Sequence, residues 1–262
     1  MNLSWLYHFP PFVFFLLVIG LVAAVSVTGF LIIRKPVERW LGKPPAQNAV
    51  ISYYIHATGV VYGITLGLIT VGMWENYNHV NVKVEEEAAT LGAVYRDVSS
   101  YPEPYKSQLT GELKTYTRYL IDEAWPLQEK GIIPQAGVDQ MNRFQKILYG
   151  FEPTSEGQKI VHAAALGSYN DYILLRRLRL QNITKSVSVM IWWVIFFGGL
   201  VNLILSWLFV VTHKSLHILM NALLGALIGA LVFIIIVLDF PFRGWFKVSS
   251  EPFEITYQQL MK

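Results

Sequence analysis

The stretch FVFFLLVIGLVAAVSVTGFLII, Phe12–Ile33, contains no Asp, Glu, Lys or Arg. Three more uncharged apolar stretches follow at Ala49–Trp74, Ser186–Thr212 and Ser215–Leu238, and the four are 22 to 27 residues long. A helix needs about 20 predominantly apolar residues to cross a hydrocarbon core of roughly 30 Å. The sequence therefore predicts an all-α membrane protein with four transmembrane helices.

The composition narrows the class of protein further. With 53% hydrophobic residues, the 262-residue chain is too apolar for an ordinary soluble domain, and its formal charge of +3 does not indicate nucleic-acid binding. The chain has no cysteine, which excludes disulfides and cysteine metal sites. No metal and no cofactor are expected. Because the first stretch is full length and is followed by Arg34 and Lys35, it predicts a retained span and not a cleaved signal peptide.

The order of the stretches predicts two helical hairpins separated by a polar region. The linker Arg34–Asn48 contains three prolines and predicts a turn-rich connection. Only His213–Lys214 separate the last two stretches, which predicts a tight antiparallel hairpin. Residues 239–262 form the tail. The region 75–185 between the hairpins predicts a helical, solvated bundle.

Apolar residues recur every three or four positions through this middle region, as in amphipathic helices. No Pro or Gly separates the first of these stripes, Val80–Val98, from the second span, so we expect one helix to continue out of the membrane. Ser155 and Gln158 have the spacing of a capping box, which predicts the start of a long helix toward the third span. The stripes are expected to pack on one another or on another subunit.

Glycines are spaced four residues apart in the second and fourth spans. Small residues let helix backbones approach closely in a membrane. The pattern predicts helix-packing faces, or alternatively a smooth pore or a gating hinge in the second span, and the two faces are expected to meet. These glycines are Gly59, Gly63 and Gly67 in the second span, and Gly225 and Gly229 in the fourth.

Two asparagines and one histidine within the predicted spans are candidates for a specific role. Asn202 and Asn221 are expected to make interhelical hydrogen bonds, because an unpaired amide is costly in hydrocarbon; contact with a water-filled path is the alternative. His56 lies a few residues inside the second span, where an interfacial histidine is ordinary and a gating role is the alternative.

Charged residues flank the spans. Arg176, Arg177 and Arg179 precede the third span and predict contact with anionic lipid headgroups or with anions. Three successive acids at 85–87 spread around the helix, so most are expected to be solvated. Asp239 and Arg243 are expected to pair if the helix continues past Leu238. No catalytic triad, metal-binding spacing or nucleotide motif is present, so the sequence predicts no enzyme.

Two segments resemble the bestrophin-like membrane family of bacteria and plants. They read Gly59-Val-Val-Tyr62-Gly63-Ile-Thr-Leu-Gly67, followed by Trp74, Tyr77, Glu87-Ala88 and Arg96, and Leu238-Asp239-Phe240-Pro241-Phe242-Arg243-Gly244, shortly before Pro252-Phe253. The resemblance covers most of Ala49–Phe253. It implies a four-span protomer with a cytoplasmic helical middle region and a homo-oligomeric assembly. Bestrophins proper are pentameric anion channels whose second span lines the pore.

The resemblance also decides the orientation. Seven basic residues flank the spans on the side of the middle region and five on the other side, a difference too small to decide by the positive-inside rule alone. With the resemblance, we expect the middle region and both termini to be cytoplasmic in a bacterial inner membrane.

The leading hypothesis is a homo-oligomeric ion channel in the lipid bilayer, with inorganic ions as its cargo and anions favoured over cations. We expect one stripe of the second span to line the path: Thr58, Tyr62, Thr65, Ile69, Met73 and Asn76. The alternative is a non-conducting sensor or scaffold whose middle region binds a ligand or a partner.

Overall fold

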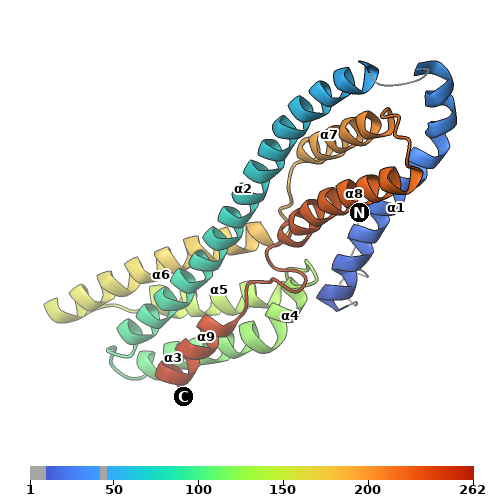
Figure 1. The fold of residues 1–262 in the computed structure, drawn as a ribbon. Coiled ribbons are helices and arrows are strands. Elements are labelled where there is room, and N and C mark those ends of the chain that lie inside the picture. Colours follow the sequence, from blue (N-terminus) through green and yellow to red (C-terminus); the bar gives the residue numbers. More distant parts are fainter. Residues whose placement is uncertain (1–9, 42–45) are drawn as a thin grey trace. The chain divides into compact units, whose positions relative to one another are not determined.

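The computed structural model describes residues 10–41 and 46–262, which are mostly helical and contain no β-strand in these ranges. Four of the described helices are long and apolar enough to cross a membrane (Figure 1). They are α1 (Pro11–Leu41), α2 (Ala46–Val98), α7 (Val189–Trp207) and α8 (Lys214–Leu238). The predicted all-α class is confirmed, and so is the presence of four helices apolar enough to span a membrane.

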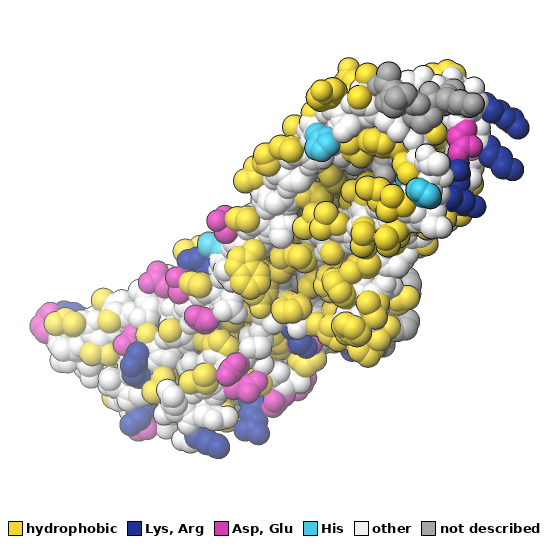
Figure 2. Space-filling model, viewed as in Figure 1, with side chains coloured by type: hydrophobic (Ala, Val, Ile, Leu, Met, Phe, Trp, Pro, Cys, Tyr) yellow, Lys and Arg dark blue, Asp and Glu magenta, His cyan; other side chains and the backbone are white. Residues whose placement is uncertain are grey.

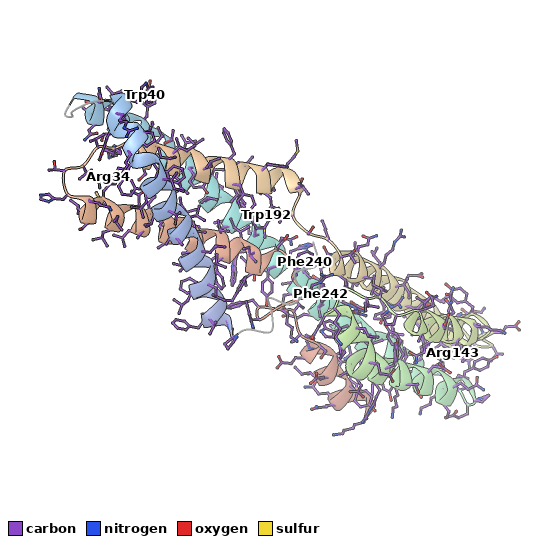
Figure 3. All side chains as sticks on the ribbon, turned by 90° about the vertical axis from the view of Figure 1, so that its right-hand side faces the viewer. Arg34, Trp40, Arg143, Trp192, Phe240 and Phe242 are labelled. Atoms are coloured by element: carbon purple, nitrogen blue, oxygen red, sulfur yellow. The ribbon has the colours of Figure 1, made fainter. Side chains whose placement is uncertain are left out.

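The chain divides into two compact units. The membrane unit comprises Met1–Glu75 and Ser186–Asp239, and the middle unit comprises Asn76–Lys185 and Phe240–Lys262. Hydrophobic side chains crowd the visible face of the membrane unit, whereas charged side chains are scattered over the middle unit (Figure 2). Trp40 and Arg34 lie toward one end of the membrane unit, and Trp192 lies toward the other (Figure 3). Tryptophan commonly lies at the two membrane interfaces.

Helices α1 and α8 form the closest helix pair of the membrane unit. Gly225 lies against Ala23 and Gly229 against Ile19, and a Cβ atom on either glycine would stand only 2.8 or 3.0 Å from the Cα of that neighbour. The residue numbers rise on one helix as they fall on the other, so the helices are antiparallel. Because α1 packs most extensively on α8, the predicted arrangement in two hairpins is not confirmed.

The connections between the spans differ from those predicted. Helix α1 continues through Pro36 to Leu41, so the helical part extends well into the predicted linker, and Pro44 and Pro45 lie outside the described residues. Helix α7 ends at Trp207 and not near Thr212. The loop that follows is held by the Asn48 side chain, which donates to Val210 O (2.8 Å) and accepts from Val210 N (3.1 Å).

The middle unit is a helical bundle around one hydrophobic core. As predicted, α2 continues into it as a single helix to Val98. It also contains α3 (Tyr105–Tyr119), the π-helical turn η2 (Leu120–Ala124), α4 (Trp125–Gln128), α5 (Ala136–Tyr149), α6 (Glu156–Ile183), α9 (Glu251–Thr256) and the π-helical turn η3 (Tyr257–Met261). The predicted capping of α6 is present in part, because Ser155 Oγ accepts from Gln158 N as in a capping box, whereas Gln158 Oε1 accepts from Thr154 N, one residue before the N-cap.

The tail is part of this core, which the sequence had not indicated. Phe242, Val248, Phe253 and Met261 are buried in the middle unit. Phe242 and Phe253 both contact Trp125, with their ring centroids 5.8 and 5.7 Å from that of the Trp125 ring. The stripes of the middle region therefore pack on one another and on the tail.

Candidate functional site

The membrane-spanning part of α2 is the least covered of the four spans. In the most hydrophobic 18-residue stretch of each span, 6% of α2 is buried, compared with 17% for α1, 28% for α7 and 44% for α8. Val60, Ile64 and Leu68 are each about 60% exposed or more. This helix therefore presents most of its surface to surroundings outside its own protomer.

The predicted pore-lining stripe lies largely on the covered side of α2. Tyr62 is buried, and its hydroxyl donates to Ile195 O at 2.9 Å. Its ring fits against Gly198 of α7, where a Cβ atom would stand 2.5 Å from the ring carbon Cδ2. Met73 is also buried. Both side chains are therefore covered within the protomer, because glycine in α7 allows the Tyr62 ring to pack inward, and their pore-lining role stays a prediction.

The remaining residues of the stripe have mixed environments. Thr58 and Thr65 line an apolar pocket of about 370 Å³ between α2 and α7, together with Val194 and Phe197. Ile69 is half-buried and Asn76 is exposed. Most of the predicted stripe therefore faces α7 of the same protomer or the pocket between α2 and α7.

The glycines of α2 and α8 lie in different surroundings. Gly59 faces the Asn202 side chain, and a Cβ atom added at Gly63 or Gly67 would meet no atom within 4 Å. Gly225 and Gly229 face α1, so the expectation that the two glycine faces meet is wrong. The backbone and side chains of α1 at Ile19, Val22 and Ala23 fill the space that these glycines leave on α8. A packing role for Gly63 and Gly67 stays a prediction about a second subunit.

A face of small and polar residues is left open on α2. It consists of Ser52, His56, Gly63, Gly67 and Thr70, which recur at helical spacing and are exposed or half-buried. The imidazole Nδ1 of His56 lies 2.6 Å from Ser52 O, and the Thr70 hydroxyl donates to Leu66 O at 2.8 Å. Both bonds stay within α2. The side chains of His56 and Thr70 therefore form no hydrogen bond to another helix of the protomer in these contacts. We refer to it below as the open face.

Both membrane asparagines form hydrogen bonds with a neighbouring helix. Asn202 Oδ1 accepts from the Thr58 hydroxyl at 3.3 Å. Asn221 Oδ1 accepts from Ser206 at 3.1 Å and from Ser26 at 3.5 Å, which joins α8 to α7 and α1. The amides therefore link the helices of the membrane unit, and each is buried.

His217 belongs to the same buried polar group and was missed in the sequence. Its Nε2 lies 3.1 Å from Ser206 O, and its ring centroid lies 4.1 Å from that of Phe30. The position of His217 inside an otherwise uncharged span was the available signal. Its bonding within the protomer points to a structural role.

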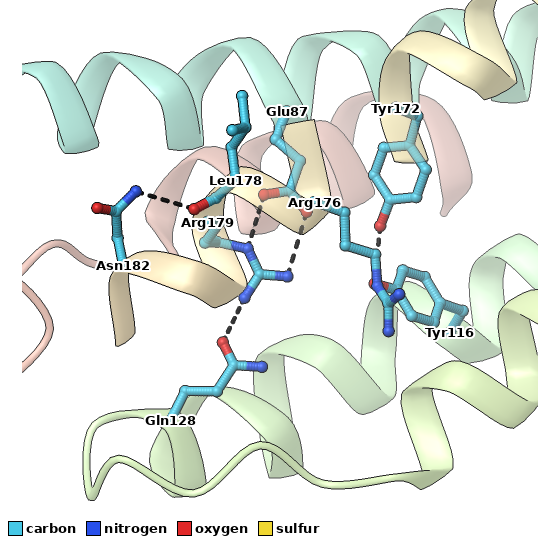
Figure 4. Close-up of polar contacts among 8 residues, drawn as sticks. All are labelled: Glu87, Tyr116, Gln128, Tyr172, Arg176, Leu178, Arg179 and Asn182. Carbon is cyan, nitrogen blue, oxygen red and sulfur yellow. Dashed lines mark hydrogen bonds and ion pairs between the residues drawn. The ribbon is translucent and has the colours of Figure 1, made fainter. Parts of the chain in front are cut away.

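The middle unit contains a buried ion pair between α6 and α2 (Figure 4). Arg179 Nε and Nη2 donate to the two carboxylate oxygens of Glu87 at 2.6 and 3.1 Å, and both side chains are fully buried. Arg179 Nη1 donates to Gln128 Oε1. The guanidinium also lies over the rings of Trp125 and Phe253, 5.2 and 5.9 Å from their centroids.

This arrangement overturns the prediction that Arg179 contacts lipid or free anions. A guanidinium that is enclosed and paired with a carboxylate cannot reach a headgroup. The sequence suggested lipid contact because Arg179 lies near the third span, whereas its partner lies 92 residues away. Arg177 is exposed and Arg176 is half-buried.

The electrostatics keep the Arg179 guanidinium charged. Burial lowers its pKa, but the attraction of Glu87 and the hydrogen bonds to it raise the pKa above the usual value overall. Burial raises the pKa of the Glu87 carboxyl, and Arg179 opposes that shift. Fixed dipoles and rings thus surround a charge pair that is isolated from water.

Two tyrosines extend the cluster. The Tyr172 hydroxyl donates to the Tyr116 hydroxyl at 2.7 Å, and Arg176 Nε donates to the same Tyr116 oxygen at 3.0 Å. Burial raises the pKa of Tyr172 well above its usual value, so its hydroxyl stays protonated. The predicted basic group of residues 176–179 is therefore divided among a buried ion pair, a tyrosine-bound arginine and an exposed arginine.

One further expectation can be compared with the structure. Helix α8 ends at Leu238, so the helical continuation required for an Asp239–Arg243 pair does not occur, and Asp239 Oδ1 instead accepts from Val187 N at 2.7 Å. Among the described residues, no group of three or more His, Asp or Glu side chains could hold a metal ion.

Four apolar helices with a polar helical unit between the second and third define a helical membrane protein. The chain belongs to the Bestrophin-like family, because the Bestrophin-like domain matches residues 20–253. This confirms the family suggested by the two sequence segments. Searches among curated proteins and among solved structures give no match.

Proposed function

We propose that this protein is a homo-oligomeric ion channel of the bacterial inner membrane, conducting anions in preference to cations. The observation that carries the proposal is the exposure of α2, whose most hydrophobic window is only 6% buried. A continuous membrane helix that its own protomer leaves uncovered is suited to line a path or to contact another subunit. The family membership supports a channel-type membrane protein.

The open face of α2 is the proposed lining. Ser52, His56 and Thr70 supply polar groups, and Gly63 and Gly67 leave the backbone accessible between them. This assignment replaces the stripe through Tyr62, which packs against α7. In a closed symmetric oligomer, one residue per subunit forms a ring around the axis. Glycine and hydroxyl rings make a smooth, wettable surface.

The proposed assembly is a pentamer with the middle unit and both termini in the cytoplasm. The pentamer follows from the resemblance to bestrophins proper, and the cytoplasmic orientation follows from the resemblance together with the seven-to-five count of basic residues. The lipid bilayer and identical subunits are then the partners of the protomer, and inorganic ions are its cargo.

Conduction is tested with purified protein in a planar bilayer under asymmetric salt. We expect a current whose reversal potential lies closer to the equilibrium potential of the anion than to that of the cation. Thr70→Lys and Thr70→Glu should shift that potential in opposite directions, because each adds a ring of fixed charge to the open face. Tyr62→Phe on the covered side serves as the matched control and should leave it unchanged.

Protein that conducts nothing over a range of salts and pH contradicts the channel. The sensor or scaffold function then takes its place, with the middle unit as the binding part. Equal effects of Thr70→Lys and Thr70→Glu on the reversal potential contradict the proposed lining alone.

A further inference from the structure

Two loops of the middle unit form one surface for which the proposed channel has no use. The first is the connection between α4 and α5, residues 129–135, and the second is the tail turn, residues 240–248. Lys247 Nζ of the tail turn lies 2.7 Å from Glu129 Oε1 of the first loop. Both loops belong to the middle unit, and they lie beside each other (Figure 1). We refer to them below as the paired loops.

A second contact between the paired loops depends on a glycine. The Arg243 guanidinium lies against Gly131, and a Cβ atom at this position would collide with Arg243 Nη2. The φ of Gly131 is 78°, a conformation that residues with a Cβ atom rarely adopt. The same guanidinium lies over the Phe240 ring, 4.7 Å from its centroid. The Arg243 side chain therefore fixes the tail turn against the first loop.

The covalent chain keeps the tail turn close to the end of the fourth span. Helix α8 ends at Leu238, and Pro241 follows three residues later. Three residues of extended chain reach at most about 11 Å. The turn then folds back on itself, because Val248 N donates to Pro241 O at 2.9 Å. Residues 242–247 are therefore held near the polar end of this span.

The paired loops expose apolar side chains at this position. Ile132 is 52% exposed, Phe246 is 53% exposed and Ile133 is 44% exposed. The hydrophobic core of the middle unit covers none of the three, although it buries Phe242 of the same tail turn completely. Exposed aromatic and aliphatic side chains next to a span are typical of groups that enter the membrane interface.

The charges on the paired loops are mostly positive. Their three basic residues are Lys130, Arg243 and Lys247, and their one acidic residue is Glu129, which leaves a net charge of +2. Glu129 pairs with Lys247, whereas the Lys130 side chain is exposed to solvent. Basic side chains next to an apolar group attract the anionic headgroups of a bilayer. Lys130 is therefore placed to contact headgroups beside the apolar side chains.

We propose that the paired loops are an additional membrane contact, at which Ile132 and Phe246 enter the interface of an anionic bilayer and Lys130 binds its headgroups. The contact is separate from the four spans, because both loops belong to the middle unit. The short connection to the fourth span and the excess of positive charge favour lipid over a second copy of the chain as the occupant. The proposal does not depend on conduction by the membrane unit.

The absence of cysteine from the chain allows a label to be placed at one position at a time. Ile132→Cys and Phe246→Cys, each carrying a nitroxide, are reconstituted as the full chain in vesicles of phosphatidylcholine and phosphatidylglycerol. EPR spectroscopy then measures how strongly oxygen and a water-soluble nickel complex relax each label. Ile160→Cys is the matched control, because Ile160 is an apolar residue of α6 that is 71% exposed.

We expect oxygen to act more strongly than the nickel complex at positions 132 and 246, because oxygen concentrates in the bilayer and the complex stays in water. The order should be reversed at position 160. A stronger effect of the nickel complex at either loop position shows that water covers the surface and overturns the proposal. Protection of either loop label from both reagents shows that protein covers it, as a neighbouring subunit would, and also overturns the proposal.

The role of the headgroups is tested by changing the charge of the lipid and of the protein. In vesicles of phosphatidylcholine alone, the preference for oxygen at position 132 should fall. In the anionic vesicles, Lys130→Gln added to the labelled chain should lower this preference as well. Lys146→Gln, which changes an exposed lysine of α5, is the matched control and should leave it unaltered. A preference that responds neither to the lipid charge nor to Lys130→Gln overturns the headgroup contact.

Discussion

Glu87 of α2 and Arg179 of α6 form a buried, two-point ion pair, with Arg179 Nε 2.6 Å from Glu87 Oε2. The pair connects the helix that leaves the membrane unit with the helix that leads back to it. A buried ion pair is weak evidence for net stability, but removal of one partner leaves an uncompensated charge in a medium without water. The two residues therefore make the middle unit sensitive to single substitutions.

Glu87→Gln is expected to lower the free energy of unfolding by about 3–5 kcal/mol, because it leaves Arg179 charged and unpaired. Thermal or denaturant unfolding in detergent measures this loss. Glu86→Gln is the matched control, since Glu86 is exposed and pairs with Lys83 at the surface. Replacement of both partners, Glu87→Met with Arg179→Leu, should cost less than Glu87→Gln alone. A Glu87→Gln variant as stable as the wild type contradicts the importance of the pair.

Gly225→Ala is expected to weaken the contact between α1 and α8. The added Cβ atom would stand 2.8 Å from Ala23 Cα and 2.9 Å from Val22 O, and backbone atoms cannot move aside as a side chain can. We expect a loss of about 1–3 kcal/mol, the usual cost of overpacking. Gly20→Ala is the control on α1, where an added Cβ atom meets nothing within 4 Å. Equal stability of both variants would show that the two helices separate easily.

Gly63→Leu is expected to weaken subunit assembly without unfolding the protomer. A Cβ atom added at Gly63 meets no atom of its own protomer within 4 Å, so we expect the effect of leucine at neighbouring subunits or in the pore. Oligomer size in detergent, measured by light scattering, checks this. Gly72→Leu is the matched control, because Gly72 is equally open but points to another side of the same helix. Unchanged oligomer size in Gly63→Leu would show that Gly63 does not take part in subunit packing.

Tyr62→Phe is expected to destabilise the membrane unit by about 1 kcal/mol, because Ile195 O loses its hydrogen-bond donor while the ring still packs on Gly198. Unfolding in detergent measures the loss. Ion selectivity should stay as in the wild type. A change of selectivity instead of stability would restore Tyr62 to the pore lining.

The sequence predicted the elements that depend on local pattern. The four spans follow from uncharged length, the continuation of α2 from the absence of a breaker, and the start of α6 from the Ser155 capping box. The segments that differ depend on distant partners. Helix α7 ends early where Asn48, more than 150 residues earlier, takes both hydrogen-bonding groups of Val210. Nothing near Val210 in the sequence indicates this.

The candidate sites show the same division. Residue spacing places Thr58, Tyr62 and Thr65 on one face of α2 but does not say which face turns inward. Gly198 on α7 decides this by leaving room for the Tyr62 ring. Likewise, the three acids at 85–87 look equivalent in sequence, and only the position of Arg179 distinguishes Glu87 from its neighbours. Contacts with distant residues, and not the periodicity of the sequence, decide that Tyr62 packs inward and that Glu87 is the acid that forms the buried ion pair.

We expect His162 to contribute to the pH dependence of the free energy of unfolding of the middle unit. Its Nδ1 lies 2.6 Å from the Tyr101 hydroxyl. Burial raises the pKa of Tyr101 to about 12, with the nearby Asp97 carboxylate acting in the same direction, so this hydroxyl stays protonated and can donate to a neutral imidazole. Burial also lowers the pKa of His162 below its usual 6.5. The Tyr101–His162 bond therefore belongs to the unprotonated ring.

The sign of the effect follows from proton binding in the two states. Below pH 6.5 the unfolded chain takes up a proton on His162 more readily than the folded protein does, so the free energy of unfolding falls as the pH falls. We expect unfolding temperatures measured in a pH series to decline on the acid side. His162→Gln should reduce that decline, because it removes the titrating ring. His79→Gln, which changes an exposed histidine of the same unit, should leave it unaltered. If both variants keep the full decline, carboxylates and not the Tyr101–His162 contact govern the acid sensitivity.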